Sequence, residues 1–302
     1  MKKIEIALVN PGALTEARNN LAFCARLTQR GHSLSSMADI RELYNQPATS
    51  RFITNMSKLP HPTLQKFAAV NIIVVGASRR FLAQITRHQN EVKFMSASLQ
   101  YSDYSNNEGF VIPYELYERD ANHVGNAQYA ENYHQMQYIN SCLGAMRDYT
   151  SAREQGVDND TCGYMAPHGL RNILFISATP YQWSHMISQR VCRRNTSEMR
   201  YVMLRIWQLL YRQAPELFNS ELVGPFCMHG KCKEGKMCCG NPIGDLTLPR
   251  EYNDISKIEN VHDLRNNTET VTHERMNTPT DILNKDFPLL MTPEMEANFC
   301  IL

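Results

Sequence analysis

The stretch AAVNIIVVGASRRFLAQITRHQ, from Ala68 to Gln89, carries the clearest information about the fold. Its first part, Ala68–Val75, is a short run of apolar and β-branched residues that ends at a glycine, and this pattern predicts a buried strand. Its second part, residues 77–88, has apolar residues at helical spacing and predicts a helix. A buried strand that runs directly into a helix is typical of a mixed α/β or α+β domain.

The same signals recur on both sides of this stretch. Alternation in Ile4–Val9, before an Asn-Pro-Gly turn, predicts a strand, and Asn172–Ala178 is predicted to be a second buried strand. Thr179 and Pro180 then give a strong helix start, because Thr is a good N-cap and Pro fits the first helical position. Further helices are predicted at residues 15–30, 35–44, 122–154 and 196–214, and an extended segment at Phe94–Tyr101. We therefore expect a central sheet with long helices.

Length and charge limit the class of protein. The 302 residues carry 31 Lys and Arg against 30 Asp and Glu, and this net charge of +1 argues against nucleic-acid binding through bulk charge. No apolar run approaches the ~20 residues that span a bilayer, and the first residues do not resemble a signal peptide. We expect a cytoplasmic protein with reduced cysteines and no membrane contact. Neither a Rossmann glycine motif nor a P-loop is present.

Composition also predicts the domain organisation. From residue 241 the chain is polar and has no clear periodicity. We expect residues 1–225 to form one folded domain and residues 226–302 to form a cysteine-containing loop followed by a polar extension.

Three polar residues at the end of the predicted helix are candidates for chemistry. Gln84, Arg87 and His88 are spaced i, i+3 and i+4, so on a helix they would share one face. A guanidinium offers a planar fork of donors to a phosphate or a carbonyl edge. A solvated helix end with cations at its C-terminus would have the same pattern, so spacing alone leaves both interpretations open.

Two further segments have polar candidates. Ser96, Ser98 and Gln100 would share one side of an extended segment and could contact a base or a phosphate, although a solvated edge strand has the same pattern. The basic run Arg190–Arg194 follows the helix that Thr179 begins, and its plain interpretation is a solvated helix end.

Together these segments resemble the flavin-dependent thymidylate synthases, whose signature is R-H-R-x-x-S-x-N-E-x-S-x-R-Y. Arg87 and His88 match its first two positions, and Ser98 and Tyr101 match later ones after one inserted residue. Gln84 matches a Gln that precedes the signature in this family.

The resemblance extends to both sides and covers roughly residues 55–220. Pro60–Thr63 resembles an upstream Gly-His-x-[ST] segment, and Asn195–Arg200 resembles a downstream A-Q-x-E-I-R motif. In this family the motif N-x-R-x-L-x-x-F-x-x-x-R precedes A-Q-x-E-I-R, and Arg190 matches its last Arg.

The sequence also departs from the family pattern. Gln89, Gln100 and Gly163 stand where arginines are usual, which removes three positive charges, and Met95 and Ser96 replace Asn and Glu. Other cations could compensate, and the candidates are Arg193, Arg194 and Arg200. The departures leave three outcomes open: a thymidylate synthase, a C5-methylase or hydroxymethylase of another pyrimidine nucleotide, or a non-catalytic nucleotide-binding relative.

The resemblance implies a homotetramer with active sites formed between subunits. It implies a FAD-dependent methyltransferase that moves a one-carbon unit from methylenetetrahydrofolate to C5 of dUMP, with reduced FAD as the relay and NADPH as the reductant. Arg190 would be the catalytic residue, polarising the pyrimidine electrostatically. The implied nucleotide-binding residues are Gln84, Arg87, Ser96, Ser98, Gln100 and Arg190. The implied FAD-binding residues are His61, Thr63, Arg87, His88, Gln89, Thr179, Tyr181 and His185.

A cysteine-rich segment, FCMHGKCKEGKMCCG at residues 226–240, lies outside this resemblance. Cys227, Cys232, Cys238 and Cys239 could hold Zn²⁺ tetrahedrally. Their spacing is C-x4-C-x5-C-C, which differs from the paired C-x-x-C of zinc ribbons, and a loop of reduced thiols flanked by lysines is the alternative. A zinc-stabilised interaction module at residues 225–240 is therefore a further hypothesis.

Overall fold

The computed structural model describes residues 4–105, 109–113, 115–116, 133–230 and 232–240. The predicted polar extension from residue 241 and the first part of the predicted helix 122–154 lie outside these residues. No described helix is long and apolar enough to cross a bilayer.

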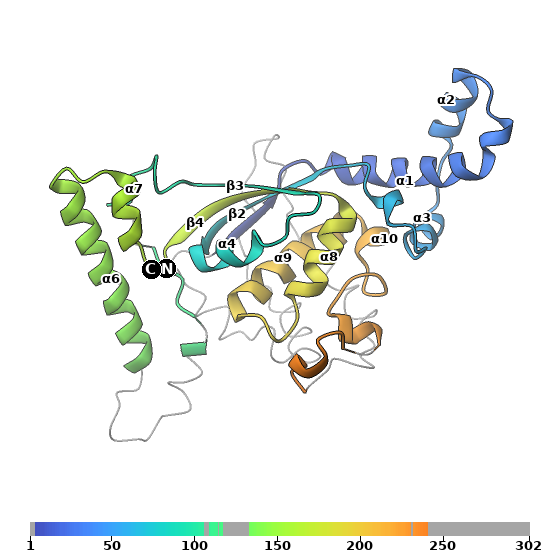
Figure 1. The fold of residues 1–302 in the computed structure, drawn as a ribbon. Helices are drawn as coiled ribbons and strands as arrows, with labels where there is room; N and C mark the ends of the chain where they lie inside the picture. The colour runs from blue at the N-terminus through green and yellow to red at the C-terminus, as the bar shows by residue number, and fades with distance from the viewer. Residues whose placement is uncertain (1–3, 106–108, 114, 117–132, 231, 241–302) are drawn as a thin grey trace.

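A four-stranded antiparallel sheet forms the centre of the fold (Figure 1). The strands, in spatial order, are β1 (Glu5–Leu8), β2 (Val70–Ser78), β4 (Arg171–Ala178) and β3 (Val92–Ser96). The two predicted buried strands, β2 and β4, occupy the middle of the sheet. Their register shifts between Val75 and Ala77. Gly76, at this bulge, has a φ of +89°, a conformation in which a side chain would be strained.

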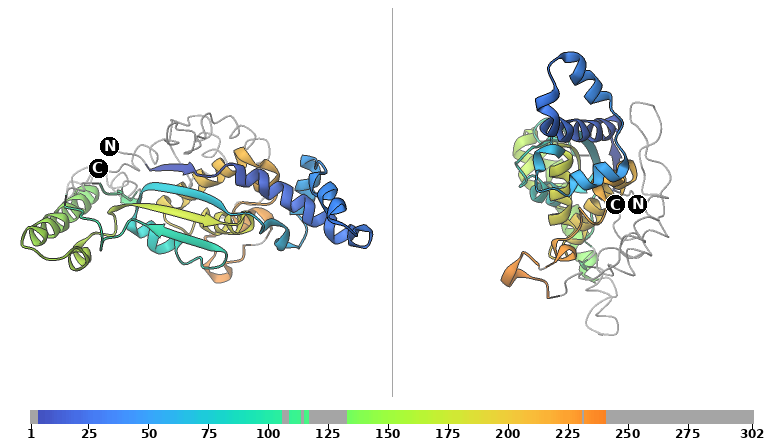
Figure 2. Two further views of the ribbon diagram at one scale, coloured as in Figure 1. Left: turned by 90° about the horizontal axis from the view of Figure 1, so that it is seen from above. Right: turned by 90° about the vertical axis from the view of Figure 1, so that its right-hand side faces the viewer.

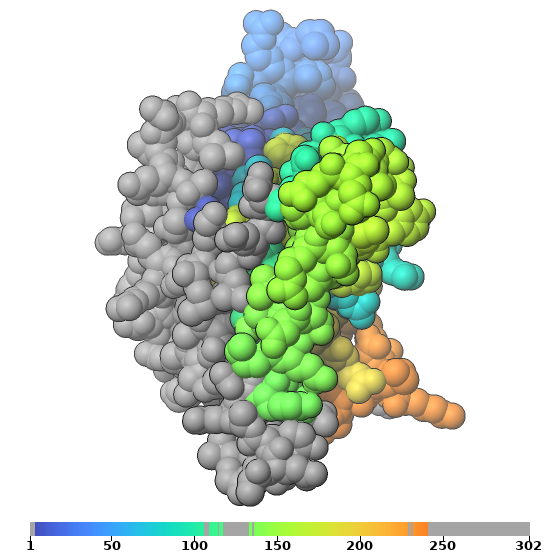
Figure 3. Space-filling model, turned by 90° about the vertical axis from the view of Figure 1, so that its left-hand side faces the viewer, coloured from blue at the N-terminus to red at the C-terminus, as the bar shows by residue number. Residues whose placement is uncertain are grey.

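Helices cover one face of the sheet and extend from its two ends (Figure 1). α8 and α9 lie against the sheet, α1 to α3 project at one end, and α6 and α7 form the surface at the other end (Figures 1 and 3). The helices are α1 (Gly12–Arg30), α2 (Met37–Asn45), α3 (Ser50–Ser57), α4 (Arg79–Ile85), α6 (Tyr133–Glu154), α7 (Asn159–Cys162), α8 (Pro180–Arg190), α9 (Ser197–Gln213) and α10 (Pro215–Phe218). The short 3₁₀ segments are η1 (Gly31–Ser33), η2 (Pro62–Gln65), η3 (Gly163–Met165), η4 (Phe226–His229) and η5 (Gly235–Met237).

The core lies between the sheet and the pair α8 and α9. Trp183 of α8 and Trp207 of α9 are fully buried, and each indole N–H donates to a backbone carbonyl, of Val70 and Phe218 respectively. Burying side chains of this size contributes roughly 1.5–3 kcal/mol each. This packing fixes α8, and therefore the residue at its C-terminal end, relative to β2 and β4.

Described helices cover the opposite face of the sheet less. In the view from above, the strands are seen without a described helix across them (Figure 2). Ile173 is 46% exposed and Met95 is 72% exposed, although both belong to strands. Exposed apolar side chains of this kind on a sheet face are suited to contact with another protein surface.

Two predicted boundaries were wrong, and hydrogen bonds explain both. The predicted helix 77–88 is shorter, because Ser78 ends β2 and caps α4 by accepting from the Phe81 N–H at 3.0 Å, and α4 ends at Ile85. The segment predicted to be extended to Tyr101 stops at Ser96. The Ser98 hydroxyl then accepts from the Gln100 amide at 3.0 Å and forms a turn.

The predicted start of α8 is confirmed. The Thr179 hydroxyl accepts from the Gln182 N–H at 3.2 Å, and Pro180 is the first helical residue. Ser36 likewise caps α2 through a reciprocal capping box with Asp39.

Candidate active site

Arg190, at the C-terminal end of α8, is held by three neutral groups. Its Nε donates to His88 Nε2 at 2.8 Å, and Nη2 donates to the backbone carbonyl of Gln84 at 2.9 Å. Nη1 makes a longer bond of 3.4 Å to Asn195 Oδ1. These contacts join α8 to the end of α4, which is about a hundred residues earlier in the chain. The guanidinium is therefore fixed without neutralisation of its charge by these partners.

His88 is buried, and its Nε2 must be the acceptor because Arg190 is always a donor. Burial, then the positive charge of Arg190 and then His185, lower the pKa of His88 to about 4. The imidazole is thus neutral at physiological pH, with its proton on Nδ1. The His185 ring stands edge-on to it at 6.2 Å, and Gln189 Nε2 lies 3.0 Å from His185 Nε2. We call Gln84, His88, His185, Gln189, Arg190 and Asn195 the Arg190 cluster.

The Arg190 cluster has an excess of positive charge. Burial lowers the pKa of Arg190, and Arg87, which is exposed, lies close enough to lower it further. Among the described residues, no carboxylate forms an ion pair with either guanidinium. The side-chain Oε1 of Gln84 is buried, and no described residue is its hydrogen-bond partner. Unpaired positive charge beside an unsatisfied acceptor suits an anionic or electron-rich ligand that also carries an N–H donor.

The loop between α4 and β3, which carries Arg87 to Gln89, is anchored at Glu91. Glu91 has a φ of +55°, in the left-handed region that Glu rarely adopts. Its carboxylate pairs with Lys66 at 2.6 Å and accepts from the Thr179 hydroxyl at 3.2 Å. Lys66 Nζ in turn lies 5.0 Å from the centre of the Tyr181 ring. Glu91 and Lys66 were missed by the sequence analysis, because their partners lie far away in the chain.

Two of the predicted flavin contacts lie at the edge of this anchored region. His61 precedes η2 and Thr63 lies within it, and both are exposed. η2 contacts α8, whose first turn carries Thr179 and Tyr181. The structure therefore gathers these four predicted residues near the N-terminal end of α8, whereas Arg190 and His88 are at its C-terminal end.

A separate cleft of about 650 Å³ lies beside α4, within the usual range of about 300–1,000 Å³ for ligand sites. We call it the Arg79 cleft. Its walls come from α4, β3, η3 and the segment before β4; its lining residues are Arg79, Leu82, Ala83, Thr86, Phe94, Ser96, Leu99, Gly163, Tyr164, Ala166 and His168. The Nη1 atom of Arg79 is buried and has no hydrogen-bond partner among the described residues. Nothing in the local sequence pattern distinguished Arg79 from a solvated arginine.

The Arg79 cleft accounts for some of the sequence expectations. Ser96, a predicted nucleotide contact, lines it, and so does Gly163, which stands where the family usually has an arginine. Arg79 therefore supplies a cation in the cleft that Gly163 borders. The cations expected to compensate lie elsewhere: Arg200 is buried and donates to the Ser197 hydroxyl at 2.9 Å, and Arg193 and Arg194 border a different cavity.

The remaining predicted contacts are dispersed within one chain. Gln84, Arg87 and His88 do not share a helical face, because α4 ends at Ile85 and the last two follow it. Ser98 and Gln100 lie beyond the end of β3, and the Ser98 hydroxyl is used by the local turn. Gln89 is exposed on the loop before Glu91.

Comparisons with known proteins identify relatives over most of the chain. The family described as "Thymidylate synthase complementing protein" matches residues 12–216. A flavin-dependent thymidylate synthase from Geobacter sulfurreducens is 24% identical over 234 residues, which cover 76% of this chain and 92% of the relative.

Two solved structures have the same fold. Thymidylate synthase X from Helicobacter pylori, solved with FAD and dUMP, aligns with a TM-score of 0.52 and 14% identity over 72% of this chain and 99% of its own. The UMP/dUMP methylase PolB from Streptomyces cacaoi, bound with 5-Br dUMP, aligns with a TM-score of 0.53 and 12% identity over 74% and 98%. At these identities the structural likeness establishes the mixed helix and sheet fold alone.

Proposed function

Since the chain belongs to the thymidylate synthase complementing protein family, the flavin-dependent thymidylate synthases, we propose that it transfers a one-carbon unit to C5 of a pyrimidine nucleotide, with dUMP as the first candidate. The observation that carries this proposal is the fixed, uncompensated guanidinium of Arg190, held by His88, Gln84 and Asn195. A preorganised cation in a partly desolvated site stabilises negative charge that develops during a reaction.

Arg190 and Gln84 suit the imide edge of a uracil ring. That edge presents carbonyl acceptors on both sides of an N–H donor. The guanidinium can donate to a carbonyl, and the buried Oε1 of Gln84 can accept from an N–H if its amide turns toward the ring. The positive charge of Arg190 would stabilise negative charge on the N3 and carbonyl edge of the ring, and the electron-rich ring would let C5 attack the one-carbon unit as a nucleophile. Arg190 is thus the proposed catalytic residue, and Gln84 a proposed binding residue.

The residues around α8 also fit a flavin. The neutral rings of His88 and His185 offer apolar faces with polar edges, and the cations Arg87 and Lys66 can face an anionic diphosphate. We propose that His61, Thr63, Arg87, His88, Gln89, Thr179, Tyr181 and His185 contact FAD. When bound, the flavin would supply the redox chemistry, with NADPH and methylenetetrahydrofolate as co-substrates.

The Arg79 cleft is the proposed site of the nucleotide phosphate. A dianionic phosphate in the cleft would attract the guanidinium of Arg79, whose buried Nη1 could turn toward it, and the Ser96 hydroxyl could donate beside it. This assignment replaces part of the charge that Gln89, Gln100 and Gly163 lack. Ser98 and Gln100 remain proposed nucleotide contacts.

We further propose that the active form is a homo-oligomer, a tetramer as in the prediction, with residues 1–225 as its catalytic domain. The exposed apolar side chains Met95 and Ile173 on the open sheet face support association. Association through this face would bring a second copy close to β3, after which Ser98 and Gln100 follow. It would also offer a route by which dispersed contacts complete a shared site.

The test is incubation of the full chain with methylenetetrahydrofolate, FAD and NADPH and one of dUMP, UMP or dCMP, with mass spectrometry of the nucleotide. We expect one methyl group to be added to dUMP, and we expect Arg190→Gln to abolish this while Arg51→Gln, an exposed arginine on α3, leaves it intact. A protein that takes up no flavin on titration and releases no C5 proton from any of the three nucleotides would contradict the proposal.

A further inference from the structure

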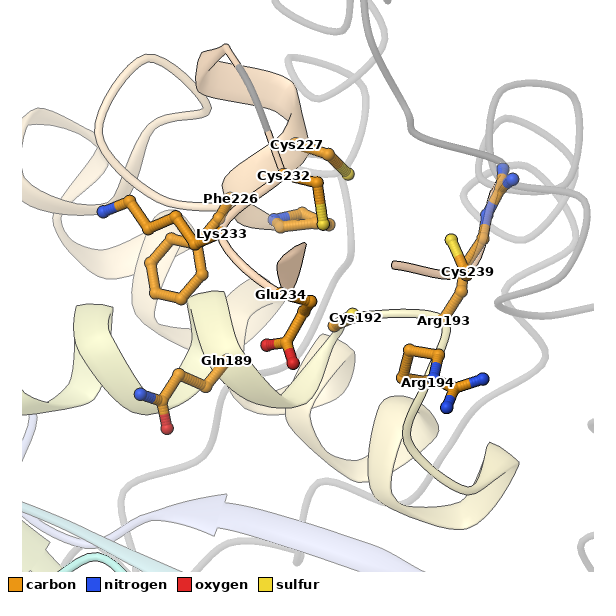
Figure 4. Close-up of a pocket in the computed structure, with 11 residues that line it drawn as sticks. Gln189, Cys192, Arg193, Arg194, Phe226, Cys227, Cys232, Lys233, Glu234 and Cys239 are labelled. Carbon is orange, nitrogen blue, oxygen red and sulfur yellow. The ribbon is translucent and has the colours of Figure 1, made fainter. Parts of the chain in front are cut away.

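Four cysteines from two distant segments border one small cavity (Figure 4). Cys192 lies in the connection between α8 and α9, and Cys227, Cys232 and Cys239 belong to the segment 226–240. The cavity has a volume of about 20 Å³. A void needs about 10–15 Å³ on this measure to hold one water molecule, so the cavity has room for a single small ion.

The thiols are close enough to influence one another. Burial is the largest cause that raises the pKa of the Cys192 thiol, and Glu234, Cys227 and Cys239 raise it further. The Cys232 thiol is also near Cys227. Cys192 was not among the sequence candidates for zinc, because it precedes Cys227 by 35 residues and has no cysteine beside it.

The surrounding charge favours an anionic cluster. Four thiolates around a divalent cation carry a net charge of −2. Arg193, Arg194 and Lys233 also border the cavity, with Glu234 as the one carboxylate among its lining residues. Figure 4 shows Cys192, Arg193 and Arg194 on the connection after α8, with the side chain of Arg194 pointing away from the segment that carries Cys227 and Cys232. Cations at this position offset the charge of a thiolate site.

We propose that Cys192, Cys227, Cys232 and Cys239 bind one soft divalent metal ion of the zinc class. Thiolate sulfur is the preferred ligand of such ions, and four cysteines form a closed structural site. In the described part of the chain, no three His, Cys, Asp or Glu side chains already have the mutual spacing of a completed metal site. Binding therefore requires the four thiols to turn into the cavity, which couples metal binding to local ordering.

The position of Cys192 gives the site a structural consequence. Cys192 follows Arg190 by two residues, so a metal ion would tie the C-terminal end of α8 to the segment 226–240. Cys238 is the useful comparison: its thiol hydrogen-bonds with that of Cys232, but it is not among the cavity-lining residues. The proposal therefore makes Cys239 a metal ligand and its immediate neighbour Cys238 not a ligand.

The experiment dialyses the full chain against zinc chloride and then against metal-free buffer, and measures bound metal by mass spectrometry. We expect one zinc ion per wild-type chain. Cys192→Ser and Cys239→Ser should each retain less than about one tenth of the zinc that the wild type retains, because a Cys-to-Ser change removes a soft ligand. Cys238→Ser and Cys24→Ser, which alters a cysteine on α1, should retain one ion.

A second measurement distinguishes the loss of a metal ligand from a folding defect in the Cys192 variant. Cobalt loading of the wild type should give the strong sulfur-to-metal absorption of a tetrahedral thiolate site, and Cys227→Ser should lose this absorption while its circular dichroism stays unchanged. The proposal is overturned if the wild type retains no zinc, if Cys238→Ser loses as much zinc as Cys239→Ser, or if metal-free protein carries a Cys232–Cys238 disulfide that zinc does not prevent.

Discussion

Arg79, the first residue of α4, and Arg190, which contacts the other end of α4, are two half-buried arginines that differ in how their donors are satisfied. Arg190 has three neutral partners that hold its guanidinium in one orientation. Arg79 lines an open cleft, and its buried Nη1 has no partner in the described part of the chain. A donor that is fixed before the ligand arrives needs no reorganisation during reaction, whereas an unsatisfied donor is completed by a ligand that brings its own charge. From this difference we expect Arg190 to stabilise charge during the reaction and Arg79 to bind the phosphate of the nucleotide.

The largest expected effect comes from Arg190→Lys. Lysine keeps the charge but cannot reproduce the planar fork that contacts His88 and Gln84 together. We expect kcat to fall about 100- to 1,000-fold, as for loss of a preorganised donor, with a smaller change in nucleotide affinity. The rate of C5 proton release from dUMP at saturating substrate would measure kcat. A variant with unchanged kcat and weaker binding would reverse the roles assigned to the two arginines.

The second prediction concerns Glu198, on which the position of α4 depends. Its carboxylate accepts from the Ser78 N–H and the Ser78 hydroxyl, each at 2.6 Å, and Ser78 caps α4. Burial is the main cause that raises the pKa of Glu198 to about 7, against the opposing effect of these hydrogen bonds. A raised pKa means that the folded state binds the proton more tightly than the unfolded state. The contribution to stability is therefore complete below about pH 4.5 and is lost as pH rises through about 7.

Glu198→Gln should remove this pH dependence, because the amide keeps a similar shape without a charge. Over that window we expect the wild type to lose up to about 3 kcal/mol of unfolding free energy that the variant does not lose. Urea unfolding at pH 5 and pH 8 measures the difference. If the unfolding free energy changed equally with pH in both proteins, another group would be the one that titrates. The Arg190 cluster and the Arg79 cleft would then not depend on the protonation of Glu198.

Arg79→Gln should affect binding more than turnover. Loss of one charged hydrogen bond costs about 1.5–3 kcal/mol, so KM for the nucleotide should rise about 10- to 100-fold while kcat changes little. Inorganic phosphate should also become a weaker competitor, because the variant lacks the charge of Arg79. Since this probe has no uracil ring, its weaker binding would locate the loss at the phosphate site. A fall in kcat at constant KM would place Arg79 in the chemistry and remove the distinction between the two arginines.

These residues also show what the sequence could predict. The strands β2 and β4 and the start of α8 follow from local apolar runs and a Thr-Pro cap, which act within a few residues. Arg190 and His88 could be identified through motif resemblance, and the structure brings them into contact. Arg79 looked like any solvated arginine, because its burial depends on residues that follow it by about a hundred positions.

The start of α4 and the conformation of the loop before β3 were missed for a related reason. Ser78 is a cap that the apolar pattern does not reveal, and Glu198, its partner, lies 120 residues away. Glu91 adopts a positive φ because Lys66 and Thr179 hold its carboxylate, and neither is near it in sequence. Long-range polar contacts of this kind decide the local conformation without a local sequence signal.

The smallest expected effect is that of His88→Gln, which tests whether Arg190 needs a neutral acceptor or an imidazole. The Gln carbonyl can accept from Arg190 Nε, so we expect less than about 1 kcal/mol of change in unfolding free energy at pH 7. The folded-state pKa of His88 is lowered to about 4 from an ordinary 6.5, so its contribution to stability is present above pH 6.5 and is lost as pH falls through about 4. The variant should lack this acid-side loss, which unfolding at pH 4.5 and pH 7 would measure. His88→Leu is the matched control: it removes the acceptor, and it should lower kcat where Gln preserves it. Equal kcat in the two variants would mean that Gln84 and Asn195 alone hold the guanidinium, and that the orientation of Arg190 does not depend on His88.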